Sequence, residues 1–507
     1  MTQTEALAIM LAGNSVLLTG AAGTGKTYTL NKYIRLARAA GKSVSVTATT
    51  GLAATHINGC TIHSWAGIGI RNSLNKSFFD NMPKNRIQII NNTDVLIIDE
   101  VSMLHDYRLD LVDNVCRVAR ETDKPFGGIQ VIFCGDFFQL PPIQENEYSG
   151  NAFITNSSAW QELEPDICYL KKQFRQQNDN DYAEILNGIR DGYLRPSQIN
   201  QITSRLNHQP SAEELSEITR IYTMNRNVDS VNSKRLAEID SDSKTYYATY
   251  SGRKDKIELL KKSSLASEEL SLKIGAFVMF IKNSLEKKYI NGSLGIVESF
   301  DKESGYPQVR LKNGNKVLAK PDTWELTDGD KTVASMSQIP LKLAWAITVH
   351  KSQGMSLDSA VINLSETFVE GMGYVALSRV KSIDNLYLEG MNNKALLVSA
   401  EAKVLNKKFL EFSEQSKIKH KDTINKYKEE AKNPVNNVKL NKWSDKLQSM
   451  REKYPNAYKP WTEKQDKKLI ELFSEGKTIS ELSKKFGRHK GSIKSRISKH
   501  LGEDIWA

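Results

Sequence analysis

A short apolar segment that runs into a glycine-rich loop constrains this 507-residue chain most strongly. Residues 15–19 (SVLLT) have the composition of a buried strand, residues 20–27 (GAAGTGKT) follow directly, and residues 28–39 have the pattern of a helix. A strand, a GxxxxGK[ST] loop and a helix in this order bind phosphate, because the curled backbone directs N–H groups at phosphate oxygens. The helix N-terminus adds a favourable dipole. The sequence therefore predicts an α/β fold with a nucleotide site.

Two side chains and the loop backbone are expected to hold the nucleotide. Lys26 would reach the β- and γ-phosphates, and the Thr27 hydroxyl would bind Mg²⁺. The phosphates would lie on the backbone of Gly20, Ala21, Ala22, Gly23, Thr24 and Gly25.

A second apolar segment, residues 94–98 (DVLII), ends in two carboxylates, Asp99 and Glu100. Strand alternation predicts that the two side chains point to different sides, so their roles can differ. We expect Asp99 to complete the Mg²⁺ site with Thr27, and Glu100 to act as general base on the attacking water. Without the phosphate loop upstream, such an acidic pair would be read as a solvated strand end.

A third strand is predicted at residues 129–134 (IQVIFC), before the segment 135–142 (GDFFQLPP). Strands that alternate with helices indicate a parallel sheet, in which ligands bind at the carboxyl ends of the strands. Gln139 follows such an end and is expected to contact the γ-phosphate or the attacking water. Taken alone, the segment is equally a turn held by its two prolines.

The positive charge of the chain is confined to its last part. The net charge is +11, and residues 417–507 hold 23 Lys/Arg against 12 Asp/Glu, whereas residues 1–416 hold 47 of each. This distribution indicates a balanced body and a basic appendage that suits a polyanionic partner. A solvated, lysine-rich helical tail is the alternative.

Membrane and secreted classes are excluded by the pattern of apolar residues and cysteines. The longest apolar runs are far shorter than the ~20 residues that span a bilayer, and the N-terminus lacks the basic and small-residue features of a signal peptide. The cysteines are scattered, without the spacing of a zinc site or a disulfide framework. We expect a cytoplasmic protein. The cysteines are Cys60, Cys116, Cys134 and Cys168.

An ordered set of further motifs resembles the Pif family of superfamily 1 DNA helicases, relatives of the RecD-type enzymes. The resemblance covers about residues 1–415. It is carried by DEVSM (99–103), FGGIQ (126–130), GDFFQLPP (135–142), TATTGLAA (47–54), GCTIHSW (59–65), FRQ (174–176), AITVHKSQG (346–354) and YVALSRV (374–380).

The resemblance implies two RecA-like domains with ATP in the cleft between them. It assigns Arg175 and Arg379 to the second domain as arginine fingers, which would stabilise the transferring phosphoryl group when the cleft closes. It also implies that Gln3 reads adenine and that Gln353 and Gly354 line the nucleotide site.

The resemblance further implies a DNA path that grips the backbone of a single strand without reading its sequence. Trp65 is left open between stacking on a base and packing in the core. The expected contacts are Thr47, Thr49, His63, Trp65, Thr348, His350, Lys351 and Ser352.

The family pattern also predicts the domain organisation. Its parts are a first RecA-like domain (1–165) with a wedge insertion at about 66–83, a second RecA-like domain (166–241 and 341–415), an SH3-like β-barrel insertion (242–340) and a polar linker (416–440). The Phe78-Phe79 pair of the wedge would lie against an unpaired base step or, equally, pack on the core.

Residues 441–507 are predicted to form three short helices that resemble a Myb-like helix-turn-helix. Trp461 precedes the first helix, and Gly487 caps the second. Arg488, Lys490 and Lys494 are the expected DNA contacts, with a protein-binding module of SANT type as the alternative.

Together these features predict an ATP- and Mg²⁺-dependent 5′-to-3′ DNA helicase that acts on single-stranded and forked DNA. The alternatives are a DNA-stimulated ATPase that remodels protein–DNA complexes without unwinding, and an adaptor with a dead ATP site, against which the intact catalytic residues argue. G-quadruplexes or RNA–DNA hybrids are further substrates that the family implies. We expect a monomer.

Overall fold

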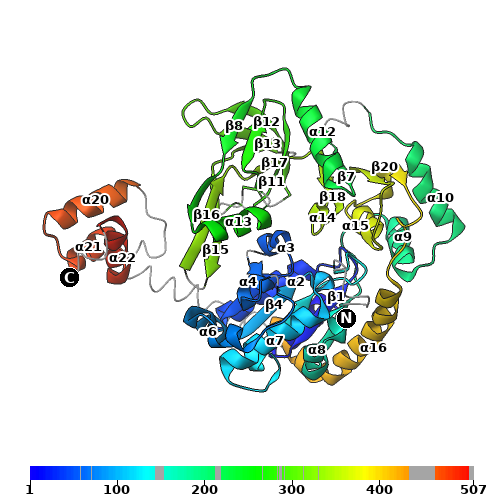
Figure 1. The fold of residues 1–507 in the computed structure, drawn as a ribbon, viewed down its shortest axis with the longest axis horizontal. Coiled ribbons are helices and arrows are strands. Elements are labelled where there is room, and N and C mark those ends of the chain that lie inside the picture. The colour runs from blue at the N-terminus through cyan, green and yellow to red at the C-terminus, as the bar shows by residue number, and fades with distance from the viewer. Residues whose placement is uncertain are drawn as a thin grey trace. The chain divides into compact units, whose positions relative to one another are not determined.

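The computed structural model describes residues 1–142, 153–211, 218–432 and 463–501, apart from positions 58, 70, 265, 283, 285–287, 290–291, 312 and 329–330. The chain forms two compact units, Met1–Asn425 and Lys426–Ala507. Figure 1 labels their helices and strands. Among the described residues, no helix is both long and apolar enough to cross a membrane.

A six-stranded sheet forms the centre of the first domain of unit 1, and all its strand pairs are parallel. In order across the sheet the strands are β3 (Cys60–Thr61), β2 (Val44–Ala48), β4 (Val95–Asp99), β5 (Gln130–Cys134), β1 (Val16–Gly20) and β6 (Asp166–Leu170). The central strands β1, β4 and β5 are buried at every position, which explains their continuous apolar runs. Its helices are α1 (Gln3–Leu11), α2 (Lys26–Ala39), α3 (Gly51–His56), α4 (Ile62–Ala66), α5 (Lys76–Asp80), α6 (Lys84–Asn91), α7 (Asp106–Arg120) and α8 (Ser158–Leu163).

The second domain of unit 1 is built on a four-stranded parallel sheet. Across the sheet the strands are β18 (Ala346–Thr348), β7 (Thr219–Tyr222), β19 (Ala360–Leu364) and β20 (Leu386–Met391). Its helices are α9 (Asn180–Asp191), α10 (Pro196–Ser204), α12 (Asn225–Ala237), α14 (Val349–Ser352) and α15 (Met372–Leu377). The α/β class with two parallel sheets agrees with the prediction.

Antiparallel sheets fill the insertion between β7 and β18. One sheet has the order β14 (Lys316–Leu318), β13 (Pro307–Leu311), β12 (Leu294–Phe300), β11 (Phe277–Phe280) and β17 (Leu341–Leu343). The others contain β15 (Asp322–Asp328), β16 (Lys331–Gln338) and β9 (Thr249–Gly252), and β10 (Glu269–Leu272) and β8 (Lys244–Tyr247). The insertion also holds helix α13 (Lys254–Ser263), which the β-rich pattern did not predict. Because β17 pairs with β11, the insertion extends past the expected end at residue 340.

The structure moves two further boundaries. Strand β6 begins at the expected start of the second domain, yet it pairs with β1 and belongs to the first sheet. Helix α16 (Ala400–Lys419) follows the second domain along the chain and returns to the first. The hydroxyls of Ser413 and Ser416 accept hydrogen bonds from the Tyr169 and Ile167 N–H groups, so the helix satisfies donors on the edge strand β6.

The expected linker at 416–440 is helical over its first part. Helix α16 continues to Lys419, and α17 (Lys421–Lys432) follows it. Its polar composition suggested a flexible linker, but Ser416 and His420 are held by contacts to β6, and Ile424 is buried. The rest of the segment lies outside the described residues.

After the end of α17, the described part of unit 2 contains three helices, as predicted: α20 (Glu463–Ser474), α21 (Ile479–Phe486) and α22 (Lys490–Leu501). Thr478 and Glu481 form a capping box at the start of α21, and Gly487 ends it with φ 59°. Trp461 lies outside the described residues. The core consists of Leu469, Leu472, Leu482, Phe486, Ile493 and Ile497.

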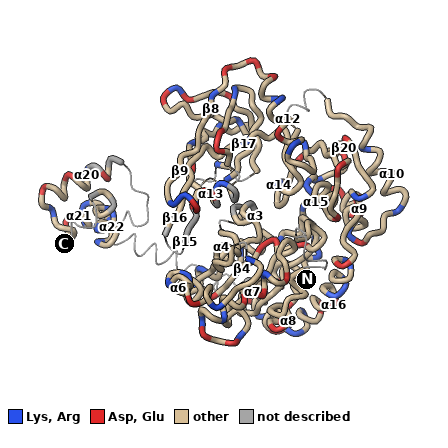
Figure 2. The backbone as a smooth tube through the Cα atoms, viewed as in Figure 1, with Lys and Arg blue, Asp and Glu red and all other residues tan. Residues whose placement is uncertain are grey.

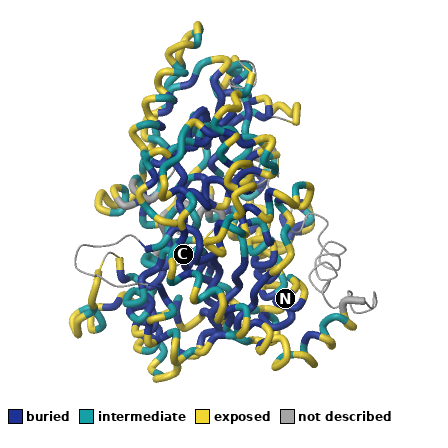
Figure 3. The backbone as a smooth tube through the Cα atoms, turned by 90° about the vertical axis from the view of Figure 1, so that its right-hand side faces the viewer, coloured by how far each residue is buried: buried dark blue, intermediate teal, exposed yellow. Residues whose placement is uncertain are grey.

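Figure 3 shows how buried and exposed residues are distributed over the chain: strands β1, β4 and β5 and helix α15 are buried throughout, whereas β9 at the edge of its sheet is largely exposed. Lysines, arginines and acidic residues alternate along unit 1, in keeping with its balanced charge (Figure 2). One hydrophobic cluster runs through both parallel sheets, so the two domains share a continuous packed interior.

Candidate nucleotide and nucleic-acid site

A cavity of about 680 Å³ lies where the two domains of unit 1 meet. The first domain lines it with the phosphate loop, Glu100 and Gln139, and the second with Gly354 and Arg379. Phe174 and Arg175, which follow β6, also line it. Residues far apart in the sequence therefore converge on one cavity, as the motif set predicts.

The phosphate loop leaves β1 at Gly20 and enters α2 at Lys26. Gly23 has φ 87°, and a Cβ there would lie 2.7 Å from the Cβ of Arg175, so both the backbone angle and the packing require glycine. The Lys26 ammonium donates to the carbonyls of Gly20 (2.8 Å) and Ala21 (3.1 Å). Thr27 is exposed and lines the same cavity. The loop is thus open toward a ligand.

Asp99 is the last residue of β4, and Glu100 leaves the strand in a left-handed conformation with φ 54°. This conformation is uncommon for a residue with a side chain and is found at functional sites. The turn, rather than strand alternation, therefore separates the two carboxylates. The Asp99 carboxylate accepts a hydrogen bond from the Glu100 N–H at 2.9 Å.

Glu100 is contacted from both domains. Gln353, just after α14, donates from Nε2 to the Glu100 carboxylate at 2.9 Å. Burial, the largest cause, and the neighbouring negative charge of Asp99 together raise the pKa of Glu100 to about 7, against the opposing effects of Lys26 and Arg379. Burial also raises the pKa of Asp99. A carboxyl group with a pKa near neutrality is suited to accept a proton at physiological pH.

The two arginines reach the cavity by different routes. Arg379 is almost completely buried and donates to the carbonyls of Ser352 and Met355 in the second domain. Arg175 was assigned to the second domain, but its main chain packs on the phosphate loop, where the Phe174 N–H donates to the Gly23 carbonyl. Its guanidinium donates to the Ser378 carbonyl at 2.8 Å, so Arg175 bridges the domains.

Gln139 and Gln3 both lie at the site. Gln139 is buried, lines the cavity and donates from Nε2 to Asp136 at 3.5 Å. Gln3 donates to the Thr24 carbonyl at 3.1 Å, beside Gly25 of the phosphate loop. The reading of adenine by Gln3 stays a prediction.

The oxygen donors present are suited to Mg²⁺. Among the described residues no cluster of three or more His, Cys, Asp or Glu side chains could hold a metal by itself. Mg²⁺ commonly takes only one or two protein ligands and completes its shell with phosphates and water. The Thr27 hydroxyl and the Asp99 carboxylate supply oxygen ligands of the kind it prefers.

The structure changes the predicted DNA path, because several of the expected side chains are occupied within the protein. Thr47 is fully buried and donates to the Ile97 carbonyl, and Thr49 donates to the Glu100 carbonyl. Ser352 is also fully buried and donates to the Val349 carbonyl, while Thr348 caps α14. These hydroxyls position the backbone of the motifs and are not presented to a ligand in this structure.

The aromatic residues of the predicted DNA path also pack within the protein. Trp65 was left open between stacking on a base and packing in the core. It is 4% exposed and belongs to the hydrophobic core, so in this structure it packs. Phe78 and Phe79 of the expected wedge are partly buried against the core, with their rings edge to face at 5.4 Å.

Three expected contacts remain partly exposed: His63, His350 and Lys351. Burial lowers the pKa of His63 to about 4, and its Nε2 lies 3.1 Å from Arg108. Burial also lowers the pKa of His350. Both imidazoles are therefore mainly neutral at pH 7.

In unit 2 one of the three expected DNA contacts is buried in this structure. Arg488 is 2% exposed and reaches Gln465 at 3.4 Å, because the turn after α21 directs it into the core between the helices. Lys490 and Lys494 are exposed on α22.

The cavity is also lined by residues that the motifs did not single out: Gln177, Asn178, Ser356, Lys381, Ser382 and Asn385. Each lies within a few positions of Arg175, Gly354 or Arg379. Proximity to a motif was the only signal in the sequence that pointed to them.

Comparison with known proteins identifies the family. Residues 3–199 match the PIF1-like helicase family. Over 473 residues the chain is 40% identical to the ATP-dependent DNA helicase Pif1 of Psychrobacter, an alignment that covers 82% of this chain and 71% of that protein.

The chain belongs to the PIF1-like helicase family.

Solved structures of Pif1 helicases have the same architecture. The Candida albicans Pif1 helicase superposes with a TM-score of 0.70 at 34% identity, covering 80% of this chain and 98% of that one. A Bacteroides Pif1 helicase in complex with ADP-AlF3 and ssDNA gives a TM-score of 0.60 at 30% identity, covering 80% and 97%. The chain spans 59% to 63% of the length of the vertebrate PIF1 relatives that it matches.

The raised pKa of Glu100 predicts a pH-dependent cost to stability. In the folded protein the carboxyl binds its proton more tightly than in the unfolded chain, where its pKa is 4.5. The tighter binding of this proton therefore stabilises the folded protein fully below pH 4.5, and this stabilisation is lost as the pH rises through 7. We expect Glu100→Gln to increase the free energy of unfolding at pH 8 by about 1–3 kcal/mol.

Urea denaturation without nucleotide at pH 8 and pH 5 measures this effect, and the gain should shrink at the lower pH. Glu325→Gln, at an exposed strand position, controls for the substitution itself. A gain that is equal at both pH values would contradict the raised pKa.

Proposed function

We propose that this chain is an ATP-dependent DNA helicase that translocates 5′ to 3′ on single-stranded DNA and hydrolyses Mg-ATP in the cavity between its two domains. The observation that carries the proposal is the meeting of Lys26 and Glu100, from the first domain, with Gln353 and Arg379, from the second. Membership of the PIF1-like helicase family supports it.

The phosphate loop supplies binding and orientation. Its backbone N–H groups would hold the β-phosphate, and Lys26 would leave the carbonyls of Gly20 and Ala21 to reach the γ-phosphate. Exchange of neutral carbonyl partners for phosphate oxygens is favourable, because the ammonium is attracted more strongly to an anionic acceptor than to a neutral one.

Glu100 would take a proton from the attacking water. Its position at the rim of the loop and its pKa near neutrality suit a general base, which has to be ionised before the step and protonated after it. Gln353 holds the carboxylate by one oxygen and leaves the other for water. Gln139 would help to orient that water.

Arg379 and Arg175 would stabilise the charge that develops on the transferring phosphoryl group. A guanidinium is planar and keeps its positive charge, so it can act at a fixed distance when the domains are closed. Because Arg379 is anchored to carbonyls of the second domain, its approach to phosphate depends on domain closure.

Thr27 and Asp99 are the residues that would hold Mg²⁺. The ion would neutralise phosphate charge and help to orient the nucleotide.

Single-stranded and forked DNA are the proposed substrates, with structured DNA such as a G-quadruplex and RNA–DNA hybrids as further candidates. One relative was solved with ssDNA and another at a forked duplex. Lys351, His350 and His63 are the expected side chains that stay partly exposed for the DNA backbone. The proposed form is a monomer.

Unwinding of duplexes with a single tail tests the proposal. The purified full chain with ATP and Mg²⁺ should unwind a 5′-tailed duplex and leave a 3′-tailed duplex intact. Lys26→Ala should bind the tail yet unwind neither, because the γ-phosphate loses its ammonium partner. Unwinding from the 3′ tail alone would contradict the polarity, and DNA-stimulated ATPase without unwinding would favour a protein-remodelling translocase.

For unit 2 we propose a DNA-tethering role through α22. Lys490 and Lys494 are exposed on this helix, and the positive surplus of the chain falls in residues 417–507. Exposed lysines would contact phosphates, which makes the affinity dependent on salt. The Myb-like classification stays a prediction, with a protein-binding module as the alternative.

The double variant Lys490→Ala/Lys494→Ala tests this role. We expect weaker duplex DNA binding at low salt, and a slope of log affinity against log salt that is shallower by about 1–2. Lys484→Ala/Lys485→Ala removes the same charge from exposed positions of α21 and serves as the control. Fluorescence anisotropy with the full chain gives both slopes, and an unchanged slope for the α22 variant would contradict the proposal.

A further inference from the structure

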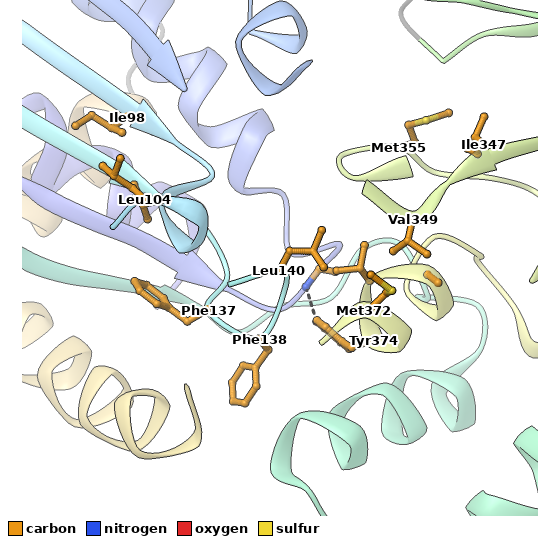
Figure 4. Close-up of a cluster of buried hydrophobic side chains, with 14 of the residues drawn as sticks. Ile98, Leu104, Phe137, Phe138, Leu140, Ile347, Val349, Met355, Met372 and Tyr374 are labelled. Carbon is orange, nitrogen blue, oxygen red and sulfur yellow. Dashed lines mark hydrogen bonds between the residues drawn. The ribbon is translucent and has the colours of Figure 1, made fainter. Parts of the chain in front are cut away.

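A single hydroxyl group joins the phosphate loop to the second domain. Tyr374, in α15, is 1% exposed, and its Oη accepts a hydrogen bond from the Ala22 N–H at 3.0 Å (Figure 4). It also accepts from Arg190 Nη1 at 3.0 Å and donates to Asp136 Oδ2 at 3.2 Å. A phenol can accept two hydrogen bonds and donate one, so the hydroxyl is fully used. Burial raises the pKa of Tyr374 to about 12, which keeps the proton that it donates.

The partner of this hydroxyl is a buried ion pair between the domains. Asp136 follows β5 in the first domain, and Arg190 lies in α9. Arg190 Nη1 lies 2.7 Å from both oxygens of Asp136, and both side chains are almost fully buried. The same guanidinium stacks over the Phe138 ring at 4.3 Å and donates to the Tyr169 hydroxyl. Burial opposes the charge on Asp136, but Arg190 outweighs it and lowers the pKa of that carboxyl.

Tyr374 and Arg190 belong to one packed group. The hydroxyl of Tyr182, in α9, donates to the Leu377 carbonyl of α15 at 2.8 Å, which ties the two helices together. Their partners, Ala22 and Asp136, both follow strands of the first sheet. If the second domain turns away, the Ala22 N–H and the Asp136 carboxylate therefore lose their partners in the same movement.

The closeness of the two surfaces supports this coupling. A Cβ at Gly371, the residue before α15, would lie 2.6 Å from the carbonyl oxygens of Phe138 and Gln139. The N-terminal end of α15 thus rests on the backbone of the segment that contains Asp136. Leu140, Met372 and Tyr374, which Figure 4 labels, belong to one hydrophobic cluster.

We propose that Tyr374 is a positioning residue that holds the phosphate loop in its hydrolysis-competent shape only while the two domains are closed. The inference rests on the proposed ATPase function and deepens it. Domain closure then has two separate effects. It orders the phosphate loop through the hydrogen bond to Ala22, and it brings Arg175 and Arg379 to the phosphate.

Tyr374→Phe removes the hydroxyl and keeps the ring. The variant loses the hydrogen bond from Ala22 together with those to Arg190 and Asp136, and we expect this to lower the ssDNA-stimulated kcat for ATP about 3- to 10-fold. The Kd for ATP without DNA should change less than about 2-fold, because the cost falls on closure. Tyr182→Phe is the matched control: it removes an equally buried hydroxyl that bonds within the second domain. It should leave kcat within about 2-fold of the wild type.

Amide hydrogen exchange gives a readout independent of activity. In the nucleotide-free full chain, the peptide that covers residues 20–27 should exchange faster in Tyr374→Phe than in the wild type or Tyr182→Phe. Asp136→Asn is a second variant at the same junction and should change kcat and exchange in the same direction, which decides the matter if Tyr374→Phe fails to fold.

The proposal is overturned if the loop exchanges at the wild-type rate in Tyr374→Phe, or if both tyrosine variants lower kcat equally. A wild-type chain without DNA-stimulated ATPase would refute the proposed function instead, and the exchange experiment would still decide the role of Tyr374.

Discussion

Enclosure of the Glu100 carboxyl between two domains is the constraint on which the site depends. The first domain supplies the side chain from a strained turn with φ 54°, and the second supplies Gln353 as its hydrogen-bond partner. This environment raises the pKa of the group to about 7, which weakens the case for a purely structural carboxylate. The strain and the desolvation both disfavour the folded state, so packing elsewhere has to compensate for them.

The compensating packing lies on both sides of the cavity. One hydrophobic cluster continues from the first sheet into the second, and Gly371 lets the backbone before α15 approach the carbonyls of Phe138 and Gln139. A side chain at Gly371 would hold these two surfaces apart. Helix α16 adds a further tie, because it leaves the second domain and caps the edge strand β6 of the first. The two domains are therefore closely packed against each other. A small change in the distance between the domains would move the groups at the cavity.

Much of this arrangement follows from the sequence. The strands that carry the phosphate loop, Asp99 and Gln139 are continuous apolar runs with special residues at their ends, which is a local signal. The choice of sheet edge is not local: the sequence assigns residues 166–170 to the second domain, but their strand, β6, pairs with β1 and belongs to the first sheet. In the same way, the composition of residues 416–432 suggested a linker, since the contacts of Ser416 and His420 to β6 are long-range.

The DNA-facing residues were the hardest to predict, because residue type does not reveal where a side chain points. Thr47 and Ser352 have hydroxyls suited to bind phosphate, yet each hydroxyl donates a hydrogen bond to a backbone carbonyl of its own domain. Arg488 was expected on the surface for its charge, but its aliphatic stem and guanidinium are buried among the helices of unit 2. Whether a side chain is buried depends on how whole helices and strands pack. The spacing of apolar residues along a short helix does not determine that packing.

The central claim is that hydrolysis requires groups from both domains at one cavity. Single-turnover hydrolysis of pre-bound ATP in Arg379→Gln, with ssDNA present, tests it most directly. Lys381→Gln, at a neighbouring position that also lines the cavity but pairs with Asp358, is the matched control. We expect Arg379→Gln to retain ATP and to lose about 10²- to 10⁵-fold in the hydrolysis rate, while the control stays close to the wild type. Wild-type hydrolysis by Arg379→Gln would show that the second domain is not needed for the chemistry.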